Sequence, residues 1–131
     1  MDNSLKTGQY LLAVLNDNEE LTALLGEGKI FPLLAKADTL FPFVTYTRDS
    51  DVVQYTKQVG HDNTISITYR VYSEDYDTAL EIVNLIRNIL ERKTIQFEGE
   101  IKINDIRLQN VYESFSEDAF CQSITFSTMV E

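Results

Sequence analysis

The chain contains one cysteine and one histidine among its 131 residues. A single cysteine, Cys121, excludes a disulfide within the chain and is typical of a protein kept in a reducing compartment. The histidine, His61, stands in a Gly-His-Asp-Asn sequence with no cysteine or serine motif beside it. We interpret His61 as a solvated turn residue rather than a general base, and Cys121 as a small packing residue rather than a catalytic thiol.

Basic residues and long apolar runs are also scarce. Lysine and arginine number 11 against 21 acidic residues, which gives a net charge of −10. Such a chain repels phosphate backbones and anionic lipid surfaces, so specific nucleic-acid or membrane binding is not expected. No run approaches the ~18 apolar residues of a membrane span, and the first residues lack the basic start of a signal peptide. The length favours one domain over residues 1–131.

Hydrophobic periodicity predicts the secondary structure. Residues 64–72 alternate apolar and polar side chains, which indicates a strand of an antiparallel sheet with one buried face. Isoleucines change phase near Asn104 and Asp105, and a turn or bulge must absorb that slip because the strand period is two. The pattern predicts helices at residues 4–15, 18–26 and 73–93, and strands at residues 29–34, 42–49, 64–72, 101–108 and 120–130.

This order predicts an α+β fold. We expect an antiparallel β-sheet of four to five strands, one long helix packed on one face, and an N-terminal helix pair. The apolar stripe of the long helix should form a core with the inward-facing strand residues. The helix contributes Ile82, Val83, Ile86 and Leu90, and the strands contribute Ile65, Ile67, Tyr69, Ile124 and Phe126.

No motif predicts an active site, a metal site or a cofactor. The Gly26, Gly28 and Lys29 sequence fails the spacing of a phosphate-binding loop, and a helix end followed by a turn explains it better. Asp49 and Asp51 are spaced as in a calcium loop, but a valine occupies the third ligand position. Residues 98–100 form a predicted turn between strands. A carboxylate pair for hydrolysis stays open, since acidic residues are so numerous.

Residues 50–63 predict a long polar loop that carries apolar side chains. Loops of this length are usually functional or disordered. Its apolar side chains either lie under a neighbouring part of the same chain or contact another chain. They are Val52, Val53, Tyr55 and Val59.

Several blocks of the sequence resemble the tail completion, or tail terminator, family of long-tailed bacteriophages and prophages. KIFP at residues 29–32 is similar to the RIYP strand of that family, and FPFVTY at residues 41–46 is similar to its LPYVVYQ block. The helix at residues 76–89 and the strand segments at residues 106–108 and 124–126 are similar to later blocks. The closing aromatic residue of the family is replaced here by Met129 and Val130.

The resemblance implies a non-enzymatic virion component. Members form rings, commonly six-membered, at the head-proximal end of the tail tube, where they end tube polymerisation and contact the head-tail connector. It implies assembly in the host cytoplasm, then a place in the virion tail, with DNA passing but not specifically bound. Under it, Val52, Val53, Tyr55 and Val59 become a candidate subunit interface, because a ring subunit needs two different contact surfaces. The alternatives are a host adaptor or interaction domain of the same fold, and a carboxylate-dependent hydrolase.

Overall fold

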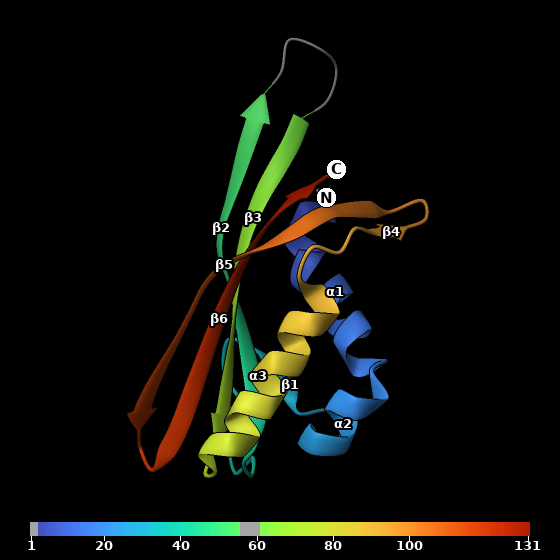
Figure 1. The fold of residues 1–131 in the computed structure, drawn as a ribbon. Coiled ribbons are helices and arrows are strands. Elements are labelled where there is room, and N and C mark those ends of the chain that lie inside the picture. Colours follow the sequence, from blue (N-terminus) through green and yellow to red (C-terminus); the bar gives the residue numbers. More distant parts are fainter. Residues whose placement is uncertain (1–2, 56–60) are drawn as a thin grey trace.

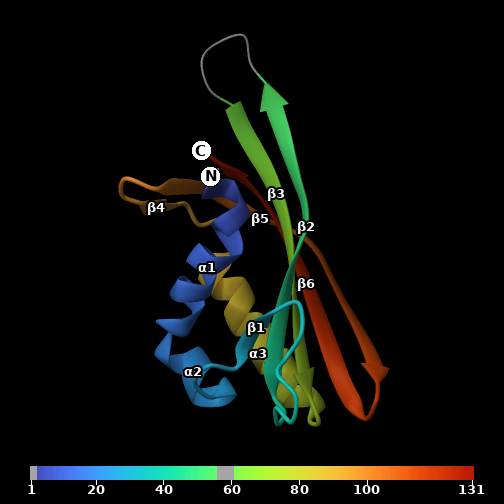
Figure 2. The same ribbon diagram turned by 180° about the vertical axis from the view of Figure 1, so that it is seen from behind.

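The computed structural model describes residues 3–55 and 61–131. These residues form a curled sheet with helices on one of its faces (Figures 1 and 2). The elements in chain order are η1 (Asn3–Lys6), α1 (Thr7–Asn16), α2 (Glu19–Leu25), β1 (Ile30–Pro32), β2 (Phe43–Tyr55), β3 (His61–Ser73), α3 (Tyr76–Leu90), β4 (Ile95–Phe97), β5 (Ile101–Ser116) and β6 (Ala119–Val130). Among the helices of the described residues, none is both long and apolar enough to cross a membrane.

The sheet has six strands in the order β1-β2-β3-β6-β5-β4. Only β1 and β2 pair in parallel; the other described neighbours are antiparallel. The α+β class is confirmed, but the predicted number of four to five strands is wrong. The additional strand, β4, spans three residues, which is too short to show a period of two in the sequence.

The helix layer also differs from the prediction of one long helix. The described residues form three short helices, and the longest, α3, has 15 residues. It begins after Asp75, whose side chain accepts a hydrogen bond from the backbone N–H of Thr78 (3.0 Å). It ends before Arg92, whose φ of 63° is not helical. The predicted N-terminal pair is present: Asn18 caps α2 through the backbone N–H of Leu21 (3.0 Å), and Gly26 ends it with a φ of 94°.

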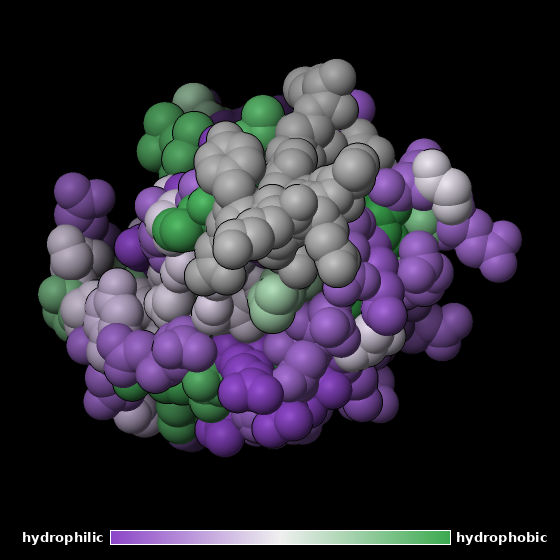
Figure 3. Space-filling model, turned by 90° about the horizontal axis from the view of Figure 1, so that it is seen from above, coloured by the Kyte–Doolittle hydropathy of each residue, from purple (hydrophilic) through white to green (hydrophobic). Residues whose placement is uncertain are grey.

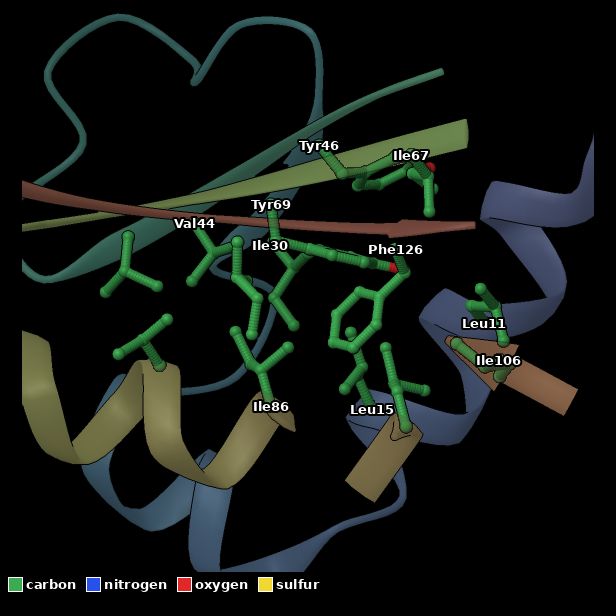
Figure 4. Packing of buried hydrophobic residues seen from close by; sticks show 14 of the residues in the cluster. Leu11, Leu15, Ile30, Val44, Tyr46, Ile67, Tyr69, Ile86, Ile106 and Phe126 are labelled. Atoms are coloured by element: carbon green, nitrogen blue, oxygen red, sulfur yellow. The ribbon is translucent and has the colours of Figure 1, made fainter. Parts of the chain in front are cut away.

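A single hydrophobic cluster lies between the sheet and the helices (Figure 4). Ile86 points from α3 toward side chains that come from the sheet, among them Phe126 (Figure 4). The nine residues predicted to form the core, four on α3 and five on the strands, all belong to this cluster. The predicted core is therefore confirmed.

The prediction of a loop at residues 50–63 is wrong in part. β2 continues to Tyr55 and β3 begins at His61, so both strands extend well past the helices (Figure 1). Asp49 has no partner in the β2–β3 register, which shifts between Arg48 and Ser50, so it forms a β-bulge. Beyond this bulge the two strands pair again up to Tyr55 and His61. Val52, Val53 and Tyr55 therefore lie on a strand rather than in a loop.

The phase change predicted in β5 is confirmed. The β5–β6 register shifts between Asn104 and Arg107, and Asp105 has a φ of 46°. Its carboxylate forms ion pairs with Arg107 (2.8 Å) and Arg92 (2.7 Å). The hydrogen bond from Arg107, followed by that from Arg92, lowers the pKa of Asp105. Any stability that these pairs contribute is present above the usual pKa of an aspartate and is lost as the pH falls through the lowered value.

Tyr69 gives a first prediction, because its hydroxyl group is buried without a hydrogen-bond partner among the described residues. Burial raises its pKa, with a smaller effect from Tyr46. An unsatisfied buried polar group costs about 1–3 kcal/mol, so Tyr69→Phe should raise the free energy of unfolding by about 1 kcal/mol. Urea unfolding followed by circular dichroism measures this change. A loss of stability would mean that the hydroxyl has a partner.

Candidate assembly surfaces

The candidate chemical groups identified in the sequence lie apart in the structure. Cys121 is buried on β6 beside Ser123, with 3.7 Å between Sγ and Oγ. It faces Tyr72, whose pKa is raised by burial first and by the neighbouring thiol second. His61 begins β3, and its side chain lies outside the described residues. Among residues 3–55 and 61–131, no three His, Cys, Asp or Glu side chains are grouped so as to hold a metal ion.

Replacing His61 with Gln and Cys121 with Ala together should therefore leave folding and assembly unchanged. Neither side chain has an assigned role, and the contacts of Cys121 with Ser123 and Tyr72 lie within the chain. Thermal melting and the sedimentation coefficient measure the two properties. A double variant that folds normally but fails to assemble would show that one of these residues has a role in a contact.

The two aspartates that are spaced as in a calcium loop instead hold the β2–β3 hairpin together. Asp49, at the bulge, accepts a short hydrogen bond from Thr68 on β3. Asp51 accepts hydrogen bonds from Ser4 of η1 (2.9 Å) and from the buried Asn63 (2.8 Å). Thr68 and Asn63 point to opposite faces of β3, so the two carboxylates do not converge on one ion.

The two glycine-containing sequences predicted to form turns, at residues 26–29 and 98–100, do form turns. Gly28 has a φ of 67° and lies between the end of α2 and the start of β1. Gly99 has a φ of 73°, and the backbone N–H of Glu100 donates to the carbonyl of Phe97 (3.0 Å) across the turn. Both positions require a left-handed backbone, which glycine adopts without strain.

One edge of the sheet is open along the outer half of β2. β1 pairs only with residues 44–46, so residues 47–55 have no strand beside them on that edge in the described part of the chain. Val52 is 53% exposed and lies across from Thr64, on the face away from the helices. Val53 lies across from the buried Asn63, on the helix side, and is half-buried.

The predicted interface residues are therefore not on one surface. Val52 and Val53 point to opposite faces of the hairpin. Tyr55 is the last residue of β2, and its side chain is not described. Val59 lies outside the described residues. Whether these residues contact another subunit stays a prediction.

The opposite edge of the sheet is open along β5. β4 pairs with residues 101–103, and the segment after α3 exchanges backbone hydrogen bonds with Ile106. Residues 107–116 have no strand beyond them among the described residues. Sequence reasoning did not find this edge, because the pattern alone does not show which strands lie at the sides of a sheet.

A groove of about 610 Å³ lies on the sheet face away from the helices. Its floor includes Arg70 and Tyr72, and its sides are residues 33–41 and the end of β5. Phe41, Phe43 and Tyr72 stack across it with ring centroids 5.3 and 5.0 Å apart. Among the described residues that line the groove, Asp38 and Glu117 carry carboxylates.

The described surface that is seen along the strands from the hairpin side is mostly hydrophilic, and its hydrophobic residues occur in small separate groups (Figure 3). Open sheet edges are sites at which another chain can add to a sheet, so the two open edges are candidate surfaces for assembly.

Comparison with known proteins identifies the family to which the chain belongs. The model of the family described as Tail completion protein gp17 matches residues 9–131, and the chain belongs to that family. This match confirms the resemblance seen in the sequence blocks, and it supports a structural role in a phage tail rather than a catalytic one.

A solved structure has the same fold. It is a chain of the virion of a native gene transfer agent particle, with a TM-score of 0.71 and 14% sequence identity. The likeness covers 92% of this chain and 91% of that chain. No curated protein matched the sequence.

Proposed function

We propose that this protein is a ring-forming tail terminator. Copies of the chain assemble at the head-proximal end of the tail tube as a ring, which is commonly six-membered in the family. The ring ends tube polymerisation and presents its other side to the head-tail connector. Family membership over residues 9–131 is the observation that carries the proposal.

The two open edges of the sheet support assembly by a head-to-tail contact. They belong to different strands, β2 and β5, on opposite sides of the sheet. Three antiparallel pairings separate these strands, so β2 and β5 run in opposite directions. Rotation about an axis along the strands therefore brings the β5 edge of one copy beside the β2 edge of the next with the strands antiparallel. Without a shift along that axis, the open parts meet at residues 47–50 of β2 and 107–110 of β5. A contact between two different surfaces closes into a ring when the rotation does.

The charge of the chain supports passage of DNA through such a ring. Each copy has a net charge of −10. A lumen formed by acidic subunits repels a phosphate backbone, so DNA passes without being bound. We place assembly in the host cytoplasm, before the protein becomes part of the virion tail.

Polymerisation of the cognate tail tube protein tests the proposal. Adding this protein to growing tubes should shorten them, and electron microscopy should show a ring at one end of each tube. Sedimentation of the protein alone should show a discrete oligomer that forms with increasing concentration. Tubes of unchanged length with no ring would overturn the proposed function.

A further inference from the structure

Exposed hydrophobic side chains gather at the two edges of the sheet. The segment after β1, residues 33–41, is called the rim loop here; its Leu33, Leu34 and Leu40 are 72%, 82% and 78% exposed. The end of β5, residues 110–116, is called the β5 tip; its Val111 and Phe115 are 42% and 60% exposed. Exposed groups of this kind mark interaction sites more often than single exposed residues do.

The rim loop and the β5 tip lie at the same level along the direction of the strands. Ile30 of β1 pairs with Val44 of β2, and Val44 pairs with Val71 of β3. On the other side of β3, Val71 pairs with Gln122 of β6, which pairs with Glu113 of β5. The row that starts at β1 thus ends in the middle of the β5 tip. A rotation about an axis along the strands brings these two surfaces of adjacent copies together without a shift along that axis.

Hydrogen bonds and a ring contact connect the β5 tip to β6 and α3. Glu113 accepts hydrogen bonds from the Tyr76 hydroxyl and from Gln122 Nε2, each of 2.7 Å. The hydrogen bond from Gln122, followed by that from Tyr76, lowers the pKa of Glu113. The ring of Phe115 packs on that of Phe120 with centroids 5.0 Å apart, and one side of Phe115 stays open.

The charges of the two surfaces are complementary. The segment of residues 29–41 has two lysines and one aspartate, and the segment of residues 110–118 has three acidic residues and no basic one. In a chain with so few basic residues, this contrast favours contact between unlike edges over contact between two β5 tips. The residues are Lys29, Lys36 and Asp38 on one side and Glu113, Glu117 and Asp118 on the other.

We propose that the β5 tip of one copy docks on the rim loop of the next copy. Val111 and Phe115 cover Leu33, Leu34 and Leu40. The acidic tip faces Lys36 in the loop and Lys29 before it. This inference rests on the proposed function, because it specifies the contact by which the ring closes. Pro32 lacks a backbone N–H and blunts the β1 edge, so side chains rather than a continuous strand ladder make this part of the contact.

Two single variants and their mixture test the contact. Leu34→Asp damages only the rim loop, and Phe115→Asp damages only the β5 tip. Each alone should weaken association by about tenfold or more, as measured by sedimentation equilibrium. Leu5→Asp, at a position 47% exposed on η1, is the matched control with the same change in charge, and it should assemble like the wild type.

The mixture of the two variants distinguishes this arrangement from others. The intact tip of Leu34→Asp should bind the intact loop of Phe115→Asp, so the mixture should give dimers with one good contact and no rings. If Phe115→Asp lowers the melting temperature, Val111→Asp replaces it. If both single variants form rings, or if the mixture stays monomeric, this contact is wrong. The proposed function is unaffected by that result as long as the wild-type chain forms a ring. A wild-type chain that never associates would overturn the proposed function as well.

Discussion

Replacing Ile86 with alanine is expected to lower the free energy of unfolding by about 2–5 kcal/mol. Ile86 has no exposed surface and points from α3 into the cluster between the helices and the sheet (Figure 4). The substitution removes three buried carbon atoms and leaves a cavity that the surrounding strands cannot fill without moving. Chemical denaturation of the monomeric form gives the change in free energy.

Leu80→Ala is the matched control on the same helix. Its side chain is 38% exposed, so the truncation should cost clearly less than it does at Ile86. A loss below about 0.5 kcal/mol at Ile86 would be far under the usual cost of such a cavity. It would show that α3 does not cover the sheet as described.

Replacing Val52 with aspartate is expected to reduce the assembled fraction strongly while the melting temperature of the monomer stays nearly unchanged. The side chain is 53% exposed on the open half of β2, so the monomer loses little packing. In a ring, a new carboxylate at this edge would be buried beside an already acidic neighbour, which costs far more than it does in water. Sedimentation velocity and thermal melting measure the two effects.

Val53→Asp is the comparison at the adjacent position. The sequence alone predicts the same behaviour for Val53, namely a loss of assembly without a loss of monomer stability. In the structure Val53 is half-buried on the helix side of β2, so its replacement should also destabilise the monomer. If Val52→Asp assembles like the wild type, this part of β2 lies outside the subunit contact.

The local pattern of apolar and polar residues was enough to predict which side chains form the core of this protein. Alternation in residues 64–72 and the apolar stripe around Ile86 each identify a buried face, because strand and helix periods are fixed by backbone geometry. The phase change near Asp105 could be located for the same reason. The family resemblance also depended on these hydrophobic blocks, and the match over residues 9–131 confirms it.

Only the tertiary structure decided where the strands end and which edges are open. Residues 50–55 form a strand, but this part of the hairpin extends past the helices, and Val52 and Val53 point to opposite faces. Without one buried face, a strand has no clear alternation, so the sequence is indistinguishable from a loop. The open edges depend on how far β1 and β4 reach along their neighbours. The proposed contact between the rim loop and the β5 tip depends on the paired residues that connect Ile30 to Glu113 across the sheet. Pairing between residues far apart in the chain determines both the open edges and the alignment of these two surfaces. The local periodicity of the sequence contains no information about such pairing.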